Sequence, residues 1–317
     1  MIEVRALSRY YGDFAALTKL DFDIKKNEVV GFVGRNGAGK STALKILAGL
    51  LAPSTGTVVI DGTNIESANS KFRSKIGFLP EKPPLYDEMT VTEFLKYLGK
   101  LRGLSSTEIN NRVPKVITKC QLKGKEKAII NELSLGFQKR VGIAQAIVHN
   151  PQLVILDEPI SGLDPFQIVE MRKVIRSLAS ESTVLLSSHN LNEIEETCDR
   201  ILILQAGKIN YQGTTEQLLQ QEDIQQKIQE RMHLIEALLI LNGKDLHTVI
   251  EKIPAIQSHK ITHQKEDIVS IEFQMQGIQV EEITAALIQQ GCGVRSIQNN
   301  TAELEQIFLD LTSREEK

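Results

Sequence analysis

The stretch GFVGRNGAGKST, residues 31–42, decides the fold class of the N-terminal part of this chain. Gly34 is followed by four residues and then by Gly39, Lys40 and Ser41, which is the spacing G-x-x-x-x-G-K-[ST] of a phosphate-binding loop. The flanking sequence predicts a short buried strand before the loop and an amphipathic helix after it, which is the context that the motif requires. The lysine and the serine at these offsets argue against a glycine-rich turn that binds nothing.

The composition of the loop explains how it would hold a polyphosphate. Its glycines allow a tight turn that points backbone N–H groups inward, and the start of the following helix adds to this anion-binding site. Lys40 would neutralise the β- and γ-phosphates, and the Ser41 hydroxyl would ligate magnesium. The residues predicted to contact the nucleotide here are Gly34, Arg35, Asn36, Gly37, Ala38, Gly39, Lys40, Ser41 and Thr42. The loop by itself does not separate kinases, switch GTPases and motor ATPases.

The bulk composition is that of an ordinary globular protein. The chain has 317 residues, of which 41% are hydrophobic and 24% are charged, so it can form one large domain and a smaller one. The formal net charge of -3 gives no general basic field, which offers no support for nucleic-acid binding. The three cysteines, Cys120, Cys198 and Cys292, are odd in number and widely spaced. This argues against a disulfide framework or a zinc cluster, and it fits a reducing cytosol.

The sequence predicts neither a secretory signal nor a membrane span. The first ten residues, MIEVRALSRY, carry charges where a secretory signal needs an apolar stretch. No run approaches the roughly 18 to 20 apolar residues that are needed to span a bilayer. If the protein works at a membrane, we therefore expect another protein to cross it.

The periodicity of the N-terminal two thirds predicts an α/β fold. Alternating residues predict strands at 2–7, 20–24 and 56–62, and the spacing becomes helical at 89–104 and 140–150. Buried parallel strands are predicted within QLVILDEP at 152–159, STVLLSSH at 182–189 and DRILILQAGK at 199–208. Strands that alternate with helices imply a mostly parallel core sheet, with active groups at the carboxyl ends of its strands.

The composition changes near residue 215. The polar, glutamine-rich stretch 214–230 predicts a connecting helix, and the apolar residues at helical intervals along it are Ile224, Ile228, Met232 and Ile235. The elements predicted beyond it are a strand at 267–275, a helix at 280–291, a strand at 294–298 and a last helix marked by Leu304, Ile307, Phe308 and Leu311. We therefore predict two domains, residues 1–220 and 221–317, of which the second is a small α/β unit.

Two acidic residues follow the strand predicted within 152–159. Asp157 is placed to hold magnesium, directly or through water, and Glu158 to accept a proton from an attacking water, as in phosphate-loop ATPases. The alternative is that the pair only caps a strand. That alternative is weaker, because two carboxylates at a buried strand end need a cation or a partner to offset their desolvation.

The stretch NELSLGFQKR, residues 131–140, resembles the signature of the ATP-binding subunits of ABC transporters, commonly written LSGGQ. Ser134 and Gly136 match it, whereas Leu135 replaces the first glycine and Phe137 stands where glutamine is often found. An aromatic residue followed by a basic pair is similar to the export-type branch of the family. On its own, the stretch would predict only an ordinary helix start capped by Ser134.

The resemblance extends to four further positions. SGLDP, with Asp164, looks like the D-loop of the family, and His189 looks like the switch histidine that senses the γ-phosphate. Tyr11 stands where the family stacks an aromatic ring on adenine, with Tyr10 as the competing candidate. Glu81 stands where many relatives have a Q-loop glutamine that contacts the metal and the attacking water. We expect the site to stay competent, because several export-type relatives resemble this pattern.

The resemblance implies an ATP-binding and ATP-hydrolysing subunit with the ABC-ATPase fold, using ATP and Mg²⁺. It implies a helical lobe over about 82–145 and a separate transmembrane permease, with the chain at the inner face of the cell membrane. It also implies a head-to-tail homodimer, in which Ser134 and Gly136 of one copy close over the ATP held by Lys40 of the other. No nucleic acid is expected as a partner, and the C-terminal domain is expected to regulate or support the dimer.

Two other functions were weighed against transport. A soluble ABC-type ATPase acting on ribosomes or DNA usually carries two ATPase halves or long coiled-coil insertions, and this sequence has neither, nor a basic face. A non-enzymatic nucleotide sensor predicts loss of Lys40 or Glu158, and both are present.

The histidines other than His189 are predicted to be structural. His259 and His263 have the spacing of a metal site on a helix, but the stretch HKITH is predicted to be extended. The two rings would then lie on one face of a strand, too far apart to share an ion.

Overall fold

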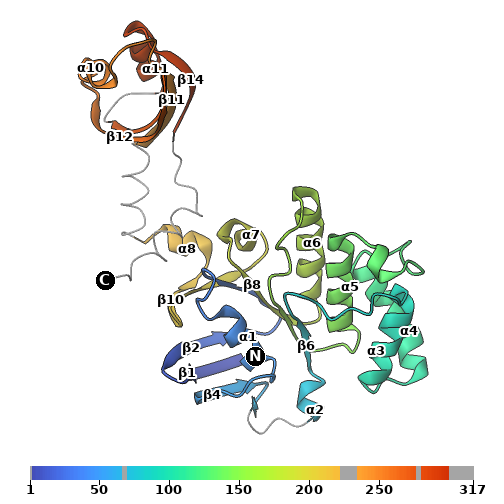
Figure 1. The fold of residues 1–317 in the computed structure, drawn as a ribbon. Coiled ribbons are helices and arrows are strands. Elements are labelled where there is room, and N and C mark those ends of the chain that lie inside the picture. The colour runs from blue at the N-terminus through green and yellow to red at the C-terminus, as the bar shows by residue number, and fades with distance from the viewer. Residues whose placement is uncertain (1, 66–69, 222–233, 276–279, 300–317) are drawn as a thin grey trace. The chain divides into compact units, whose positions relative to one another are not determined.

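The computed structural model describes residues 2–65, 70–221, 234–275 and 280–299. The chain divides into two compact units, Met1–Thr215 and Glu216–Lys317, both drawn in Figure 1. No helix in the described ranges combines the length and the apolar composition that crossing a bilayer requires.

The first unit contains an antiparallel sheet built from the N-terminal strands, in the order β2-β1-β4-β5. The strands are β1 Ile2–Tyr11, β2 Phe14–Ile24, β4 Thr55–Ile60 and β5 Thr63–Asn64. At the start of β1, Ile2 and Val4 are buried and pair with Ile24 and Phe22 of β2. The strands predicted at 2–7, 20–24 and 56–62 therefore lie together in this antiparallel sheet.

The core sheet of this unit has six strands in the order β10-β9-β3-β8-β7-β6. They are β3 Val29–Val33, β6 Ile76–Leu79, β7 Leu153–Leu156, β8 Thr183–Ser188, β9 Arg200–Gln205 and β10 Lys208–Gly213. All neighbouring pairs are parallel except β9 and β10. Every residue of β3, β7 and β8 is buried, as continuous apolar strands of a parallel sheet should be. The predicted mostly parallel core sheet is confirmed.

Helices lie on both sides of the core sheet. They are α1 Lys40–Leu47, α2 Ser70–Arg73, α3 Val91–Leu101, α4 Ser106–Lys119, α5 Leu135–Ile147, α6 Pro165–Leu178 and α7 Leu191–Glu195, with a 3₁₀ turn at Ile130–Glu132. In Figure 1, α6 and α7 lie above the core sheet and α1 lies below it, next to the antiparallel sheet. The apolar core under the core sheet joins the two sheets: the rings of Phe22 in β2 and Phe32 in β3 meet edge to face, with centroids 5.4 Å apart.

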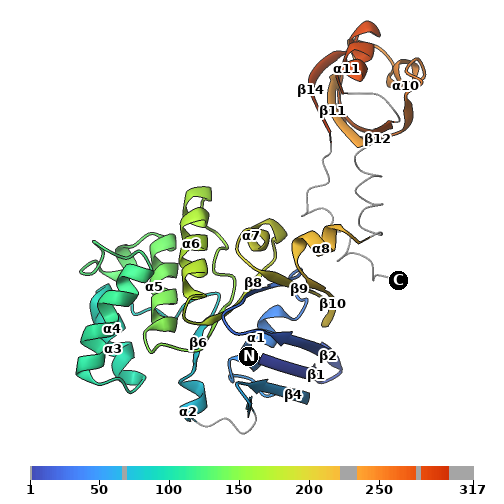
Figure 2. The ribbon, with the colours of Figure 1, turned by 180° about the vertical axis from the view of Figure 1, so that it is seen from behind.

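The helices α3 and α4 lie side by side at one edge of the unit, next to α5, as Figures 1 and 2 both show. Each begins with a capping box, in which the side chain at the cap and a glutamate three residues later exchange hydrogen bonds with the backbone. The two boxes are Thr90 with Glu93 and Ser105 with Glu108. These elements form a helical lobe within the range 82–145 that the resemblance implied.

Residues 234–275 and 280–299 of the second unit form a four-stranded antiparallel sheet with two helices. Its elements in chain order are β11 Leu234–Ile240, α10 Leu246–Ile250, β12 Ile256–Lys265, β13 Ile268–Met275, α11 Val280–Gln289 and β14 Gly293–Asn299. The strand order β12-β13-β11-β14 and the chain order βαββαβ define a ferredoxin-like unit. Its own apolar core includes Ile235 and Phe273 from the sheet and Ile283 and Leu287 from α11.

Three details of the C-terminal half differ from the expectations or fall outside the described residues. Helix α8, Thr215–Leu219, forms the start of the predicted connecting helix, whereas 222–230 and the predicted last helix lie outside the described residues. Ile235 lies in strand β11 and not on a helix, because its side chain packs into the ferredoxin-like core. The expectation that His259 and His263 share a face is wrong. A bulge between Ile261 and His263 pairs them with Phe273 and Ser270, which point to opposite faces of β13.

Candidate nucleotide-binding and catalytic site

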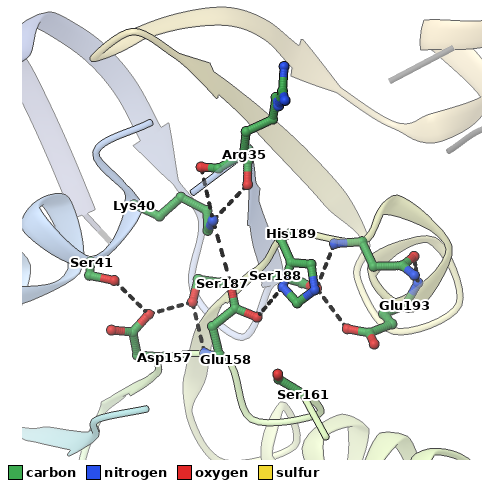
Figure 3. Close-up of polar contacts among 12 residues, drawn as sticks. Arg35, Lys40, Ser41, Asp157, Glu158, Ser161, Ser187, Ser188, His189 and Glu193 are labelled. Atoms are coloured by element: carbon green, nitrogen blue, oxygen red, sulfur yellow. Dashed lines mark hydrogen bonds and ion pairs between the residues drawn. The ribbon is translucent and has the colours of Figure 1, made fainter. Parts of the chain in front are cut away.

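The carboxyl ends of β3, β7 and β8 meet at one edge of the core sheet. The parallel register places Val33 beside Ser188, and Leu156 beside Leu186. The glycine loop after β3, the two acids after β7 and the histidine after β8 therefore begin at the same edge. Figure 3 shows these side chains converging.

The glycines of the loop are required by close backbone contacts. A Cβ on Gly34 would lie 2.6 Å from the carbonyl oxygen of Leu204, and one on Gly39 would lie 2.7 Å from that of Ala16. Gly39 also has a φ of 104°, a conformation that side-chain-bearing residues rarely adopt. Gly39 is the N-cap of α1 and provides no side-chain cap, so the first N–H groups of this helix face the loop without a capping oxygen.

Lys40 is the first residue of α1, and its side chain lies inside the loop. It is only 6% exposed. Its Nζ donates to the carbonyl oxygen of Gly34 at 2.6 Å, and it lies 3.5 Å from Oε1 of Glu158. The loop therefore surrounds the ammonium group, which faces the carboxylate of Glu158 (Figure 3).

Asp157 joins the loop to strand β8. Its Oδ1 accepts a hydrogen bond from the Ser41 hydroxyl at 3.2 Å and another from the Ser187 hydroxyl at 2.6 Å. The hydroxyl of Ser41 and the carboxylate of Asp157 are hard oxygen donors of the kind that Mg²⁺ prefers. No group of three or more His, Cys, Asp or Glu side chains that could hold a metal occurs among the described residues. The Ser41 and Asp157 oxygens would supply part of the coordination of Mg²⁺, whose other ligands in such sites are usually phosphate and water oxygens.

Glu158 is held in an unusual backbone conformation. Its φ is 49°, in the left-handed region, and its side chain is 11% exposed. Its backbone N–H donates to the Ser187 hydroxyl at 2.9 Å, and its Oε2 lies 2.9 Å from Nδ1 of His189. The carboxylate thus stands between an ammonium group and an imidazole, which is a suitable position for a proton acceptor.

Ser187 was missed by the sequence analysis, although it touches both acids. It is completely buried, accepts from Glu158 and donates to Asp157. The available signal was a pair of serines in an otherwise apolar buried strand, VLLSSH, because a buried hydroxyl in such a strand needs a partner.

The residues described above form the Lys40 cluster: Lys40, Ser41, Asp157, Glu158, Ser187 and His189. Among the described residues, no hydrogen bond or ion pair joins the predicted signature, D-loop, Q-loop and adenine residues to this cluster. Ser134 is the N-cap of α5 but makes no side-chain capping bond, so the alternative of a simple cap does not account for its hydroxyl. Asp164 caps α6 by accepting from the backbone N–H of Gln167 at 2.8 Å. Glu81 is exposed in the loop after β6.

The aromatic residues near the end of β1 are largely exposed. The exposed fractions of Tyr10, Tyr11 and Phe14 are 43%, 46% and 63%. The guanidinium group of Arg9 lies 4.7 Å from the centroid of the Tyr11 ring, so one face of that ring carries a cation–π contact. The opposite face is the one that can stack on a base.

These features together define a phosphate-loop ATPase. Comparison with known proteins shows which one: the chain belongs to the family of ABC transporter ATP-binding proteins. The family model described as ABC transporter matches residues 17–161. An uncharacterised ABC transporter ATP-binding protein of Methanocaldococcus jannaschii is 37% identical over 250 residues, which cover 77% of this chain and 91% of the relative.

Two further relatives agree with this assignment. The bacitracin transport ATP-binding protein BcrA of Bacillus licheniformis is 37% identical over 211 residues, covering 66% of this chain and 68% of the relative. A solved dimeric bacterial ABC transporter cassette, MJ0796, is 27% identical with a TM-score of 0.62, covering 68% of this chain and 98% of the cassette. The chain is therefore an ATP-binding ATPase of ATP-powered transport, and the relatives do not support the ribosome or DNA alternative.

Proposed function

We propose that this chain hydrolyses ATP as a head-to-tail homodimer and thereby powers export through a separate transmembrane permease at the inner face of the cell membrane. The observation that carries the catalytic part is the arrangement of Lys40 and His189 on either side of the Glu158 carboxylate. The direction of transport rests on relatives whose names specify bacitracin transport, multidrug transport and Nod factor export.

The loop binds the triphosphate through charge and backbone dipoles. A bound β/γ-phosphate competes with the Gly34 carbonyl for the Lys40 ammonium, and the N–H groups of residues 34–42 surround the phosphates. Ser41 and Asp157 would hold Mg²⁺, which supplies charge neutralisation on the phosphate groups when bound. Tyr11, with its free ring face, stacks on the adenine.

Hydrolysis needs a base beside the attacking water. Glu158 accepts a proton from that water, whose oxygen forms a bond to the γ-phosphorus as the bond to the β–γ bridging oxygen breaks, giving ADP and inorganic phosphate. His189 orients the Glu158 carboxylate and contacts the γ-phosphate, while Lys40 and the loop N–H groups stabilise the charge that develops. From the Q-loop position, Glu81 would offer a further carboxylate to the Mg²⁺ ion and to the attacking water.

The dimer explains the residues that lie outside the Lys40 cluster. Ser134 and Gly136 at the start of α5, with Asp164 at the start of α6, close over the nucleotide that the second copy holds. ATP then favours the closed dimer because it contacts both copies, and hydrolysis removes that preference. The solved dimer of a related cassette supports this arrangement.

The helical lobe and the second unit account for the remaining parts of the chain. The lobe between 82 and 145 receives the permease, and its exposed aromatic surface includes Tyr86 and Tyr97, whose rings lie 5.5 Å apart. The ferredoxin-like unit, within the domain 221–317, supports or regulates the dimer. No nucleic acid takes part in this scheme.

The substitution Glu158→Gln tests the proposal directly. It keeps the shape of the side chain but removes the proton acceptor, so turnover should fall by about 10²–10⁴-fold while ATP binding persists. The variant should accumulate as an ATP-bound dimer in sedimentation experiments, and the full chain should co-purify with a multi-span membrane protein. Unchanged turnover would refute the assignment of the base, and a strictly monomeric ATP-bound variant would refute the dimer.

A further inference from the structure

The backbone of Glu158 is held on both sides, at its N–H group and at its carbonyl oxygen. A left-handed conformation in a residue with a Cβ costs about 1–2 kcal/mol, so it persists only where surrounding contacts enforce it. The Glu158 N–H donates to Ser187, and the Glu158 carbonyl oxygen accepts from Nζ of Lys139 at 2.9 Å. The backbone that aims the carboxylate therefore has two tethers, one from β8 and one from α5.

Among the described residues, no hydrogen bond or ion pair joins Lys139 to the glycine loop, yet Lys139 is as buried as Lys40. Its exposed fraction is 6%, and its Nζ also donates to the carbonyl oxygen of Ser161 at 2.5 Å. Both of these acceptors are main-chain carbonyls in the segment that runs from Glu158 towards Asp164. Lys139 thus holds together the turn between the catalytic acid and the D-loop.

The surroundings of Lys139 are unfavourable for an unpaired cation. Burial lowers the pKa of the Lys139 ammonium group, and the charges of Glu158, Glu193 and Glu81 offset only part of this effect. Burying a cation of this kind is costly unless it is hydrogen-bonded, and the carbonyls of Glu158 and Ser161 supply that stabilisation.

Lys139 also lies on the helix that begins with the signature. Gly136 precedes it by three residues, so the two positions are on neighbouring parts of the same face of α5. In the proposed dimer, the start of helix α5 covers the nucleotide of the second copy. One turn later, the same helix carries the Lys139 ammonium group, which holds Glu158 of its own copy. A movement of α5 shifts both.

We propose that Lys139 is a positioning residue that couples the signature helix α5 to the Glu158 carboxylate, so that closure of α5 over one nucleotide aims the base at the other. This inference rests on the proposed function and adds a residue to it. Lys139 acts through the Glu158 backbone and touches neither ATP nor the attacking water. Its loss should therefore lower kcat and leave nucleotide affinity nearly unchanged.

The first test compares Lys139→Met with Gln138→Met in the full chain. The neighbouring Gln138 also donates from α5 to a main-chain carbonyl, that of Ile130 at 3.2 Å, but it does not touch Glu158. We expect kcat to fall about 10–100-fold in Lys139→Met, because displacement of a catalytic group by about 1 Å has effects of this size. The KM for ATP and the affinity for a non-hydrolysable ATP analogue should stay within about threefold. Gln138→Met should change kcat by less than about threefold.

The second test is a double-mutant cycle with Glu158→Gln. If Lys139 acts through Glu158, Lys139→Met should cause no further loss of turnover in the Glu158→Gln background. An equal loss in both backgrounds would overturn the inference, because it would show a general effect on the fold. If Lys139→Met does not fold, Lys139→Gln replaces it, since Gln can still donate to one of the two carbonyls. We then expect a smaller loss of kcat that is absent in the Glu158→Gln background, and an equal loss in both backgrounds would overturn the inference.

Failure of this inference can be distinguished from failure of the proposed function. If Glu158→Gln lowers turnover as expected but Lys139→Met does not change it, only the coupling role is wrong. If Glu158→Gln leaves turnover unchanged, the base assignment fails and the coupling role fails with it.

Discussion

Nδ1 of His189 lies 2.9 Å from Oε2 of Glu158, so the imidazole and the carboxylate form one hydrogen-bonded pair at the edge of the core sheet. A carboxylate only accepts hydrogen bonds, so Nδ1 is the donor in this contact. Nε2 is left to accept from water or, when it also carries a proton, to donate to a phosphate oxygen. The side chain of His189 is 50% exposed, whereas that of Glu158 is 11% exposed. The pair thus connects a buried base to an accessible ring.

His189→Ala should therefore impair hydrolysis more than binding. We expect kcat to fall by about 10²-fold, because Glu158 loses the partner that orients it and the γ-phosphate loses a contact. ATP affinity should change little, since Lys40 and the loop are intact. Steady-state kinetics and nucleotide titration measure the two quantities, with His263→Ala in the second unit as the control. A wild-type kcat in His189→Ala would contradict the role of this pair.

Ser187→Ala should disturb both acids at once. The substitution leaves the Glu158 N–H without its acceptor and Asp157 without a 2.6 Å donor, so unfolding free energy should drop by about 1–3 kcal/mol. We also expect a reduced kcat and a higher Mg²⁺ concentration for half-maximal activity.

Ser188→Ala provides the matched control for Ser187→Ala. Ser188 is also buried and donates to Glu193 at 2.7 Å, but it touches neither Asp157 nor Glu158. We expect Ser188→Ala to lower the free energy of unfolding by a comparable amount and to change the Mg²⁺ dependence of activity little. Equal effects of both variants on Mg²⁺ dependence would mean that Ser187 has only a packing role.

The loop and the acids could be predicted from sequence because their geometry follows from local rules. The strand, glycine loop and helix around Lys40 form one continuous motif, and parallel strands place Asp157, Glu158 and His189 at one sheet edge. The same argument predicts nothing about Ser187 or Lys139. Their contacts depend on which strand and helix become neighbours, and that is decided by tertiary packing.

The C-terminal unit shows a second limit of sequence patterns. Strand β11, LIEALLI, gives a mixed pattern, and Ile235 was assigned to a helix because it falls at a helical interval after Met232. The strand forms because β13 and β14 pair with it on either side. The bulge that separates His259 from His263 likewise has no signal in the residues HKITH, because bulges arise from pairing with the neighbouring strand.

Glu81→Gln should preserve ATP binding and hydrolysis while changing their coupling to transport. The side chain is exposed and lies outside the hydrogen-bonded Lys40 cluster, so the fold and the loop do not depend on its charge. An amide is a weaker ligand for Mg²⁺ than a carboxylate, but it places less negative charge near the γ-phosphate. ATP affinity within about threefold of wild type and measurable turnover are expected for the isolated chain, with altered stimulation by the permease. Complete loss of ATP binding would contradict this prediction.

His149 should make the first unit less stable in acid. Burial, with the charge of Arg102 adding to it, lowers the pKa of the ring from 6.5 to about 4, and Nε2 lies 3.1 Å from the Ile76 carbonyl. Between these pH values the unfolded chain binds more protons at this residue, so stability falls as pH decreases from 6.5 to 4. The loss of stability from this group amounts to about 3 kcal/mol at the acidic end of this range.

The substitution His149→Gln tests this prediction, because Gln can keep a donor to Ile76 but cannot titrate. The stability advantage of the wild type over the variant should therefore shrink or reverse as the pH is lowered. Hydrogen–deuterium exchange of α5 peptides measures this difference. Parallel pH profiles for the two proteins would show that the ring is not kept neutral by the fold.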